Sequence, residues 1–169
     1  MGIYKACDIR GRYPDELDEA TARDVGAAIG TELDGADCVV GGDVRGSTPA
    51  LKDALIEGLT GAGTDVIDVG VCPTPALYWS ARRLDTRGAA MVTASHNPPE
   101  YNGIKFMVGE LPVSPDDMER IRRRVEERAF RTGTGRREER DIRTDYLDWL
   151  AGCFEGELEG LSVLVDAGN

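Results

Sequence analysis

Ser95 and His96 place a hydroxyl directly beside the only imidazole of the chain, on a loop that Pro98 and Pro99 stiffen. A serine exposed on a loop at the end of a strand is a candidate nucleophile, and its histidine neighbour suggests a hydrolase. A Ser-His-Asp triad is nevertheless not favoured, because the side chains of adjacent residues are expected to point apart and no GxSxG turn is present. The same residue types also form ordinary tight turns, so the loop alone leaves both interpretations open.

Longer segments around this loop resemble one family of phosphoryl-transfer enzymes. The run Thr93 to Phe106, TASHNPPEYNGIKF, resembles the active-site signature of the α-D-phosphohexomutases, the phosphomannomutase/phosphoglucomutase family. Three further segments follow the order of that family: CDIRG at 7–11, GDVR at 42–45 and DVGVCPTP at 68–75. The final VDAGN at 165–169 resembles the opening strand of the family's second domain. The resemblance covers essentially the whole chain and implies a transfer of phosphate between positions 1 and 6 of a hexose.

The resemblance also implies catalytic roles for four residues. Ser95 is expected to carry the phosphoryl group as phosphoserine, an exposed anion that needs a neighbouring cation. Lys105 is expected to offset charge at the transferring group and to handle the proton of the attacked hydroxyl. Arg10 is expected near the reacting oxygen as an anion clamp, and an ion pair with Asp8 is the structural alternative. His96 is expected to support Ser95 by hydrogen bonding or proton relay, with stabilisation of the turn as the alternative.

Two further residues are expected to contact substrate or to shape the site. Asn97 would hydrogen-bond backbone or phosphate oxygens. Arg45, with Asp43, would bind substrate or shape the site from the adjacent loop. Tyr101 to Gly103 is predicted to be the turn that leads back into a strand, with a positive φ at Gly103.

The cofactors are also implied by the resemblance. The family uses Mg²⁺, which is bound by the phosphoserine and by three aspartates of a second-domain loop. Ser95 would supply the phosphate in this chain, and the aspartate loop is not part of the sequence. Asp8, Asp43 and Asp166 do not match that loop. Glucose or mannose 1,6-bisphosphate is expected as the activator, and a hexose phosphate as the substrate.

Two other functions remain open at this point. The form PPEYNGIKF favours phosphomannomutase/phosphoglucomutase over phosphoglucosamine mutase, which stays an alternative within the family. A non-catalytic phosphate-binding or interaction module is the alternative outside it. Retention of both Ser95 and Lys105 argues for the enzyme, because an interaction module has no need of them.

The composition indicates which kinds of partner and which cellular location to expect. The chain has 169 residues and a formal charge of −11, which argues against nucleic acid because binding DNA or RNA requires a basic surface. Its apolar stretches are too short to span a bilayer and the N-terminus lacks an apolar signal core, so we expect a cytoplasmic protein without a membrane partner. The four cysteines lie far apart and predict buried, reduced thiols rather than a metal or redox site.

Hydrophobic periodicity predicts strands that alternate with helices. Helices are expected at 18–33, 48–61, 74–84 and 115–130, and strands at 38–41, 66–70, 88–93 and 104–108. This alternation predicts an α/β domain with a largely parallel sheet, whose sites form at the C-terminal ends of the strands. The resemblance specifies a three-layer α/β/α domain with a mixed sheet.

The expected domain organisation follows from the same pattern. Residues 1–130 are expected to form the domain that carries the phosphoserine loop. The charged segment 131–141 has no apolar period and is interpreted as a linker. Residues 142–169, with a helix near Tyr146 to Phe154 and a strand at Leu161 to Val165, are expected to begin a truncated second domain, to be completed by remaining domains of a longer enzyme.

Overall fold

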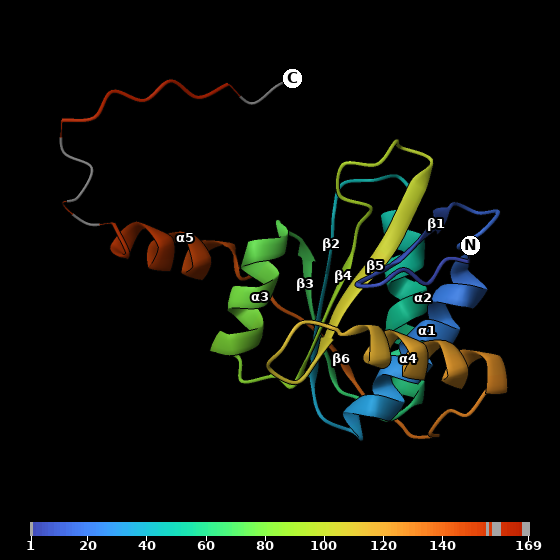
Figure 1. Ribbon diagram of the computed structural model, residues 1–169. Coiled ribbons are helices and arrows are strands. Elements are labelled where there is room, and N and C mark those ends of the chain that lie inside the picture. The colour runs from blue at the N-terminus through green and yellow to red at the C-terminus, as the bar shows by residue number, and fades with distance from the viewer. Residues whose placement is uncertain (1, 155, 157–159, 167–169) are drawn as a thin grey trace.

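A single mixed sheet organises the part of the chain that the computed structural model describes, residues 2–154, 156 and 160–166 (Figure 1). The strand order is β1-β5-β4-β2-β3-β6. β2, β3, β4 and β6 run parallel, whereas β5 is antiparallel to both of its neighbours, β4 and β1. The strands are β1 (Ile9–Arg12), β2 (Cys38–Gly42), β3 (Val66–Val71), β4 (Gly88–Val92), β5 (Tyr101–Val108) and β6 (Arg137–Glu139).

Helices cover both faces of this sheet. α1 (Glu19–Leu33), α2 (Thr48–Gly61) and α4 (Pro115–Glu127) lie on one face, and α3 (Thr74–Arg83) and α5 (Arg143–Gly152) on the other (Figure 1). The prediction of a three-layer α/β/α fold with a mixed, largely parallel sheet is therefore confirmed. No helix of the described residues has both the length and the hydropathy needed to cross a membrane.

The central strands are apolar because both of their faces are buried. In β2, Val40 packs into the core with α1 and α2 while Val39 packs into the core with α3, and Ala90 and Ala89 of β4 divide in the same way. Alternate residues of a strand point to opposite faces, so a strand between two helical layers needs apolar residues throughout. This explains why short continuous apolar runs were sufficient to predict β2 and β4.

The helices begin where local side chains satisfy their free N–H groups. The Asp18 carboxylate accepts a 2.8 Å hydrogen bond from the Thr21 N–H at the start of α1. Ser114 and Asp117 form a reciprocal capping box at the start of α4. α1 and α2 cross at Gly26 and Gly58, where an added Cβ would come within 2.2 Å of the Leu55 carbonyl oxygen and 2.0 Å of the Arg23 carbonyl oxygen, respectively. These glycines permit the close packing that holds α2, and hence the loop that precedes it, against the sheet.

Two strands lay outside the sequence expectations. β1 was not predicted, because four residues with two arginines and a glycine give no apolar period. β6 lies inside the segment expected to be a linker, where Arg137, Glu138 and Glu139 pair with β3 in parallel. All three β6 side chains are exposed, so the strand is formed by backbone hydrogen bonds that hydrophobic patterning cannot reveal.

The C-terminal segment also differs in part from expectation. The predicted helix is present as α5, and Tyr146 packs edge-on against Trp79 of α3 with ring centroids 5.5 Å apart. The strand expected at 161–165 is not formed, because these residues have no strand partner among the described residues. Residues 167–169, the end of the expected VDAGN strand segment, lie outside the described part of the chain.

Asp68 is a buried carboxylate on which β3, α2 and β6 converge, and its side chain is 3% exposed. It accepts hydrogen bonds from Lys52 Nζ at 2.7 and 3.0 Å, from the Gly70 N–H at 2.9 Å and from Arg137 Nη2. Burial raises the pKa of Asp68, but these donors outweigh burial and hold the pKa below its usual value. A carboxylate with a lowered folded-state pKa stabilises the protein above its unfolded pKa of about 3.9, and this contribution is lost as the pH falls.

We therefore expect Asp68→Asn to lower the free energy of unfolding by about 3 kcal/mol at pH 7, because it leaves the largely buried Lys52 ammonium without this carboxylate. Urea unfolding of both proteins between pH 2.5 and 7 should show this difference shrinking below about pH 4. Asp65→Asn is the matched control, because Asp65 directly precedes β3 and also pairs with an arginine. That partner, Arg136, is 88% exposed, and such surface pairs contribute under about 1 kcal/mol to the free energy of unfolding. Equal losses of unfolding free energy in the two variants, or a difference that does not depend on pH, would contradict the conclusion that the ionised Asp68 carboxylate stabilises the fold.

Candidate active site

The candidate nucleophile lies on the loop that follows β4, residues 93–100, hereafter the serine loop. β4 is parallel to β2, and Val92 pairs with Gly42, so the serine loop and the loop after β2 leave the sheet side by side. Ser95 is exposed and has a φ of 57°, the left-handed region that non-glycine residues rarely adopt. A strained residue of this kind persists only where its surroundings hold it, and such residues cluster at functional sites.

The side chains of Ser95 and His96 converge, contrary to the expectation from their adjacency. Ser95 Oγ lies 3.3 Å from His96 Nδ1, which permits a hydrogen bond in either direction depending on the tautomer. The divergence expected for neighbouring side chains assumes extended backbone, whereas the left-handed conformation of Ser95 turns the chain between them.

Arg45 connects the two loops through every N–H of its guanidinium. Its Nη atoms donate to the carbonyl oxygens of Ser95, Asn97, Pro98 and Tyr101, at distances between 2.6 and 3.1 Å. Its Nε donates to the Asp43 carboxylate at 3.2 Å. The guanidinium thus has no N–H left for a substrate in this conformation, which does not support the substrate-binding role expected for Arg45.

A polar network at the start of α2 holds Asp43 in place. The Asp43 carboxylate accepts hydrogen bonds from Thr48 Oγ1 at 2.6 Å and from the Arg45 N–H at 3.0 Å. Burial opposes ionisation, but hydrogen bonds from Thr48, Thr93 and Arg45 hold the pKa of Asp43 below its usual value. The fully buried Asn102 extends the network by donating to Thr48 Oγ1 at 3.0 Å. Asp43 is therefore a charged anchor for Arg45.

Two cations of the site share one carboxylate oxygen. Asp8 Oδ2 lies 2.5 Å from Arg10 Nη2 and 3.2 Å from Lys105 Nζ. β1 and β5 are antiparallel with Ile9 opposite Ile104, so Asp8 and Lys105 follow as neighbours on the same face of the sheet. The ion pair between Arg10 and Asp8, foreseen as a structural alternative, is present, but a cluster of two cations and one anion keeps a net positive charge.

The register brings this cationic cluster toward the serine loop. Ile104 pairs with Val92, the last residue of β4, so Lys105 pairs with Met91, one residue before that strand end. Arg10 lies closer to the serine loop, because it pairs with Gly103, whose carbonyl accepts a hydrogen bond from the Thr93 N–H. Lys105 is 32% exposed at its side chain, and the Arg10 Nε atom is buried without a hydrogen-bond partner among the described residues. The cluster thus keeps accessible positive charge near the strand end where Ser95 is located.

Asn97 takes part in the loop mainly through its backbone. Its N–H donates to the Ala94 carbonyl at 3.1 Å, and its own carbonyl accepts from Arg45. Its side-chain Nδ2 is buried and has no partner among the described residues. The expected contact of Asn97 with a phosphate oxygen stays a prediction.

The turn expected at 101–103 is wrong. These residues are the first three of β5, and Gly103 does not have a positive φ. Its glycine is required for another reason: an added Cβ would lie 2.5 Å from the Ile9 carbonyl oxygen and 2.9 Å from that of Thr93. Gly103 therefore allows β1 and the serine loop to approach β5 closely.

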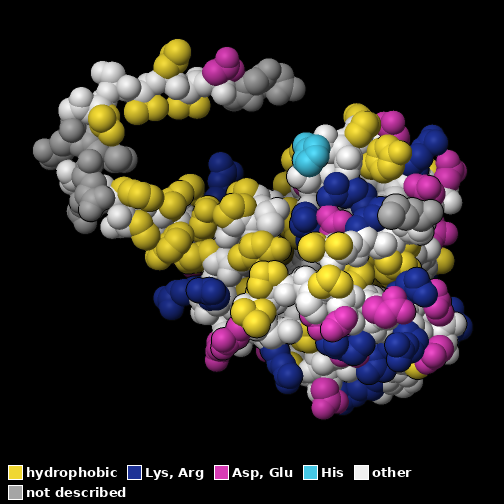
Figure 2. All heavy atoms as spheres, viewed as in Figure 1, with side chains coloured by type: hydrophobic (Ala, Val, Ile, Leu, Met, Phe, Trp, Pro, Cys, Tyr) yellow, Lys and Arg dark blue, Asp and Glu magenta, His cyan; other side chains and the backbone are white. Residues whose placement is uncertain are grey.

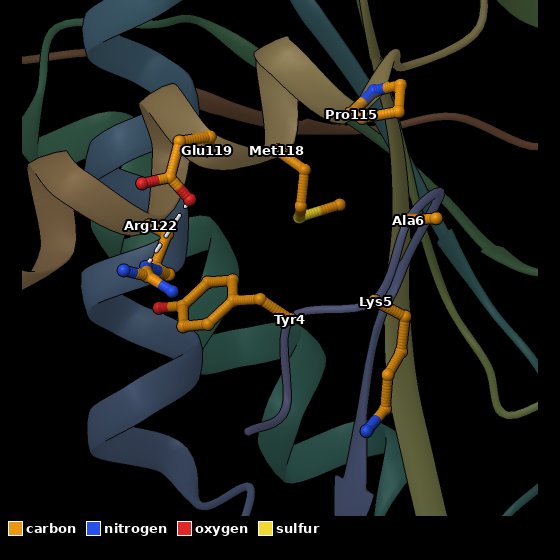
Figure 3. Close-up of a pocket in the computed structure, with 7 residues that line it drawn as sticks. All are labelled: Tyr4, Lys5, Ala6, Pro115, Met118, Glu119 and Arg122. Carbon is orange, nitrogen blue, oxygen red and sulfur yellow. Dashed lines mark ion pairs between the residues drawn. The ribbon is translucent and has the colours of Figure 1, made fainter. Parts of the chain in front are cut away.

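A hollow of about 330 Å³ lies away from these residues, between the N-terminal segment and α4 (Figure 3). Tyr4 and Met118 border it, and Arg122 pairs with Glu119 at 3.5 Å on its rim. Burial, followed by the nearby charges of Glu126 and Asp24, raises the pKa of Tyr4 to about 12. None of the candidate catalytic residues lines this hollow.

The sequence indicated Asp8 only as an alternative ion-pair partner of Arg10, and Asn102 only as part of the expected turn. Both are polar residues that strand pairing buries, at 8% and 0% exposure. A buried polar residue inside the matched segments was the available signal, but burial of Asp8 depends on β1, which was itself not predicted.

Fold and site together define an α/β domain that presents a strained, exposed serine and a cationic cluster at its strand ends. The family model described as "Phosphoglucomutase/phosphomannomutase, alpha/beta/alpha domain I" matches residues 2–132 of this sequence. The chain therefore belongs to the phosphoglucomutase/phosphomannomutase family, as the sequence predicted.

Several relatives agree with this assignment. The chain is 42% identical to phosphohexose mutases of Xanthomonas campestris pv. campestris over its whole length. It is 39% identical to phosphomannomutase/phosphoglucomutase of Pseudomonas aeruginosa over 99% of its length, and 38% identical to a phosphomannomutase of Escherichia coli over all of it. A crystal structure of a phosphoglucomutase/phosphomannomutase family protein from Burkholderia thailandensis superposes with a TM-score of 0.83 at 38% identity, covering 89% of this chain and 35% of that one. The chain spans 36 to 39% of the length of these curated relatives.

Proposed function

We propose that this chain is the phosphoserine-bearing part of a phosphohexomutase, which interconverts the 1-phosphate and 6-phosphate of mannose or glucose. The observation that carries the proposal is Ser95, exposed in a strained left-handed conformation at the end of β4. Its support comes from the Lys105–Asp8–Arg10 cluster on the neighbouring strands. The relatives named phosphomannomutase and phosphomannomutase/phosphoglucomutase favour mannose or glucose phosphate over glucosamine phosphate.

The residues of the site suggest how the transfer proceeds. The bond between phosphorus and Ser95 Oγ breaks as a hydroxyl oxygen of the hexose phosphate bonds to phosphorus, which gives a 1,6-bisphosphate. Lys105 Nζ gives a proton to the departing Ser95 Oγ and takes the proton of the attacking hydroxyl, so the lysine is an ammonium before and after the transfer. His96 is a hydrogen-bonding neighbour of Ser95 Oγ at 3.3 Å. The bisphosphate then turns around and returns its other phosphate to Ser95. Lys105 and Arg10 offset the charge of the phosphoryl group in both directions.

Magnesium is the metal that the family implies. Among the described residues, no group of three or more His, Cys, Asp or Glu side chains is placed to hold a metal ion. The contribution of this chain is therefore the phosphate oxygens of phosphorylated Ser95, and we propose that further ligands come from aspartates of a second-domain loop. When bound, the ion would neutralise charge on the phosphoryl oxygens.

The domain boundaries stay part of the proposal. We assign residues 1–130, together with strand β6 from the segment 131–141 expected to be a linker, to the phosphoserine-bearing domain, and residues 142–169 to the start of a second domain. α5 supports this assignment because none of its residues is buried. Figure 2 shows hydrophobic side chains gathered over α3 and α5, where Leu147 and Trp149 are about half exposed. Such a patch fits a surface that a further domain covers.

The proposal predicts that the 169-residue chain folds but lacks mutase activity on its own. Its described residues form a six-stranded sheet and two hydrophobic cores, the second of which includes Ile142. The phosphate of Ser95 and the phosphate of the substrate, however, repel each other without the metal loop. Added Mg²⁺ is not expected to restore activity, because one phosphate does not make a preformed oxygen site. A coupled assay from glucose 1-phosphate to glucose 6-phosphate, with urea unfolding as the measure of folding, checks both parts.

The longer enzyme that contains this chain is the positive control, and it should turn over both mannose and glucose phosphates. Mg²⁺-dependent turnover by the purified 169-residue chain would contradict the sharing of the site between domains. An inactive longer enzyme that still binds inorganic phosphate would favour the non-catalytic phosphate-binding module.

A further inference from the structure

Arg45 lies at the contact between the loop after β2 and the serine loop, and its side chain is only 14% exposed. We infer that Arg45 is a positioning residue for phosphoryl transfer, whose guanidinium holds Ser95 in its reactive conformation through the loop carbonyls. The inference deepens the proposed function and rests on it for its catalytic part. It assigns Arg45 to the enzyme's own loop rather than to the substrate.

The hydrogen-bond geometry supports this assignment directly. Nη2 donates to the carbonyls of Ser95 at 2.9 Å and Asn97 at 2.6 Å, and Nη1 donates to those of Pro98 at 2.7 Å and Tyr101 at 3.1 Å. Four carbonyls from a stretch of seven residues thus converge on one planar cation. This convergence forces the backbone from Ser95 to Tyr101 to curl around the guanidinium.

The other hydrogen bonds of the serine loop lie mostly at its two ends or within it. Thr93 N–H donates to the Gly103 carbonyl and Tyr13 N–H donates to the Glu100 carbonyl. Within the loop, Ser95 N–H donates to Thr93 Oγ1 at 2.9 Å, Asn97 N–H to the Ala94 carbonyl at 3.1 Å and Tyr101 N–H to the Pro98 carbonyl at 3.0 Å. Pro98 and Pro99 have no N–H to donate. A left-handed serine costs on the order of 1 to 3 kcal/mol and is retained only where other contacts over-determine it. The charge-assisted bonds of Arg45 supply those contacts.

Arg45 can hold the loop because Asp43 fixes its position. Asp43 accepts from its N–H at 3.0 Å and from its Nε at 3.2 Å, and Asp43 is in turn bound by Thr48 of α2. The Asp43 N–H donates to the Val92 carbonyl at 3.0 Å, which ties the pair to the end of β4. Asp43 and Arg45 thus fix the position of Ser95 relative to β4 and α2.

Lysine cannot substitute in this role. An ammonium has one nitrogen with three donors, whereas the guanidinium presents five N–H groups in a planar fork. Arg45→Lys therefore conserves charge but not the geometry of the four carbonyl contacts. Misplacement of a reacting atom by about 1 Å can reduce a rate about 100-fold.

Nuclear magnetic resonance of the 169-residue chain tests the structural part without any need for activity. We expect Arg45→Lys and Arg45→Ala to lower the ¹⁵N heteronuclear NOE of amides 94–97 and 100 and to speed exchange of the Asn97 N–H. Amides of β2 and β4 should be unchanged. Arg23→Lys is the control, because Arg23 pairs with Glu57 on the exposed surface of α1 and α2. Unchanged loop amides in both Arg45 variants would overturn the inference, and Arg45→Lys provides the test if Arg45→Ala does not fold.

Kinetics of the longer enzyme test the catalytic part. Arg45→Lys should reduce kcat, and the rate at which glucose 1,6-bisphosphate phosphorylates Ser95, by about 10- to 100-fold with little change in KM for the hexose phosphate. A raised KM with unchanged kcat would instead identify Arg45 as a substrate-binding residue and overturn the inference. If the unsubstituted longer enzyme has no mutase activity, the proposed function fails, whereas the resonance measurements still decide whether Arg45 holds the loop.

Discussion

Ser95→Ala is expected to abolish both phosphorylation and turnover of the longer enzyme, with a loss in kcat of at least about 10⁴-fold. Removing a covalent nucleophile leaves only binding and electrostatic contributions, which explains a loss of this size. The unsubstituted enzyme, treated with glucose 1,6-bisphosphate and Mg²⁺, should gain the mass of one phosphoryl group. Peptide mapping should place that group on Ser95.

Three other serines have structural roles, so we expect the phosphoryl group on Ser95 and not on them. Ser47 accepts a 2.8 Å hydrogen bond from Asn102, Ser80 is fully buried, and Ser114 caps α4. Ser114→Ala is the matched control: it should cost about 1 kcal/mol of stability through loss of the cap and leave phosphorylation intact. A label on another serine, together with an active Ser95→Ala variant, would show that the nucleophile is misassigned.

The elements that sequence reasoning predicted are those whose stability depends on apolar burial. α1 was predicted with its cap at Asp18, and β2 and β4 were predicted from apolar runs that both helical layers require. β1 was missed because its single large apolar residue, Ile9, makes no period although it is fully buried. β6 was missed because its residues gain stability from backbone pairing and ion pairs, as Arg137 does with Asp68. Hydrophobic periodicity contains no information about such strands.

The identity of the candidate nucleophile followed from motif resemblance, but its surroundings did not. Nothing in the sequence indicates that Ser95 adopts a left-handed conformation, since no glycine marks the position. The contacts of Arg45 join residues 50 to 56 positions apart, and strand order alone determines that they meet. The expected turn at Gly103 was wrong for a related reason: a glycine can serve a close approach as well as a positive φ, and only the tertiary structure distinguishes the two.

Lys105→Met is expected to lower kcat of the longer enzyme on the order of 1,000-fold while KM for the hexose phosphate stays within a few fold. Lys105 Nζ lies 3.2 Å from Asp8 Oδ2, the oxygen that Arg10 also contacts, so the lysine is held in place by a carboxylate. Its charge is needed most when charge develops on the transferring phosphoryl group, and an interaction made only in the transition state affects kcat rather than binding. Steady-state kinetics with glucose 1-phosphate, together with the rate of phosphorylation of Ser95, measure the two quantities separately.

The chain offers a close control for this substitution, since it contains only three lysines. Lys5 is exposed and donates to the Gly2 carbonyl at 2.7 Å, so Lys5→Met should leave kcat unchanged. Lys105→Arg should recover part of the charge stabilisation but little of the proton transfer, because a guanidinium does not give up its proton. Activity restored fully by arginine would mean that Lys105 acts by charge alone. A loss confined to KM in Lys105→Met would place the lysine among the substrate-binding groups and contradict its role in the transfer step.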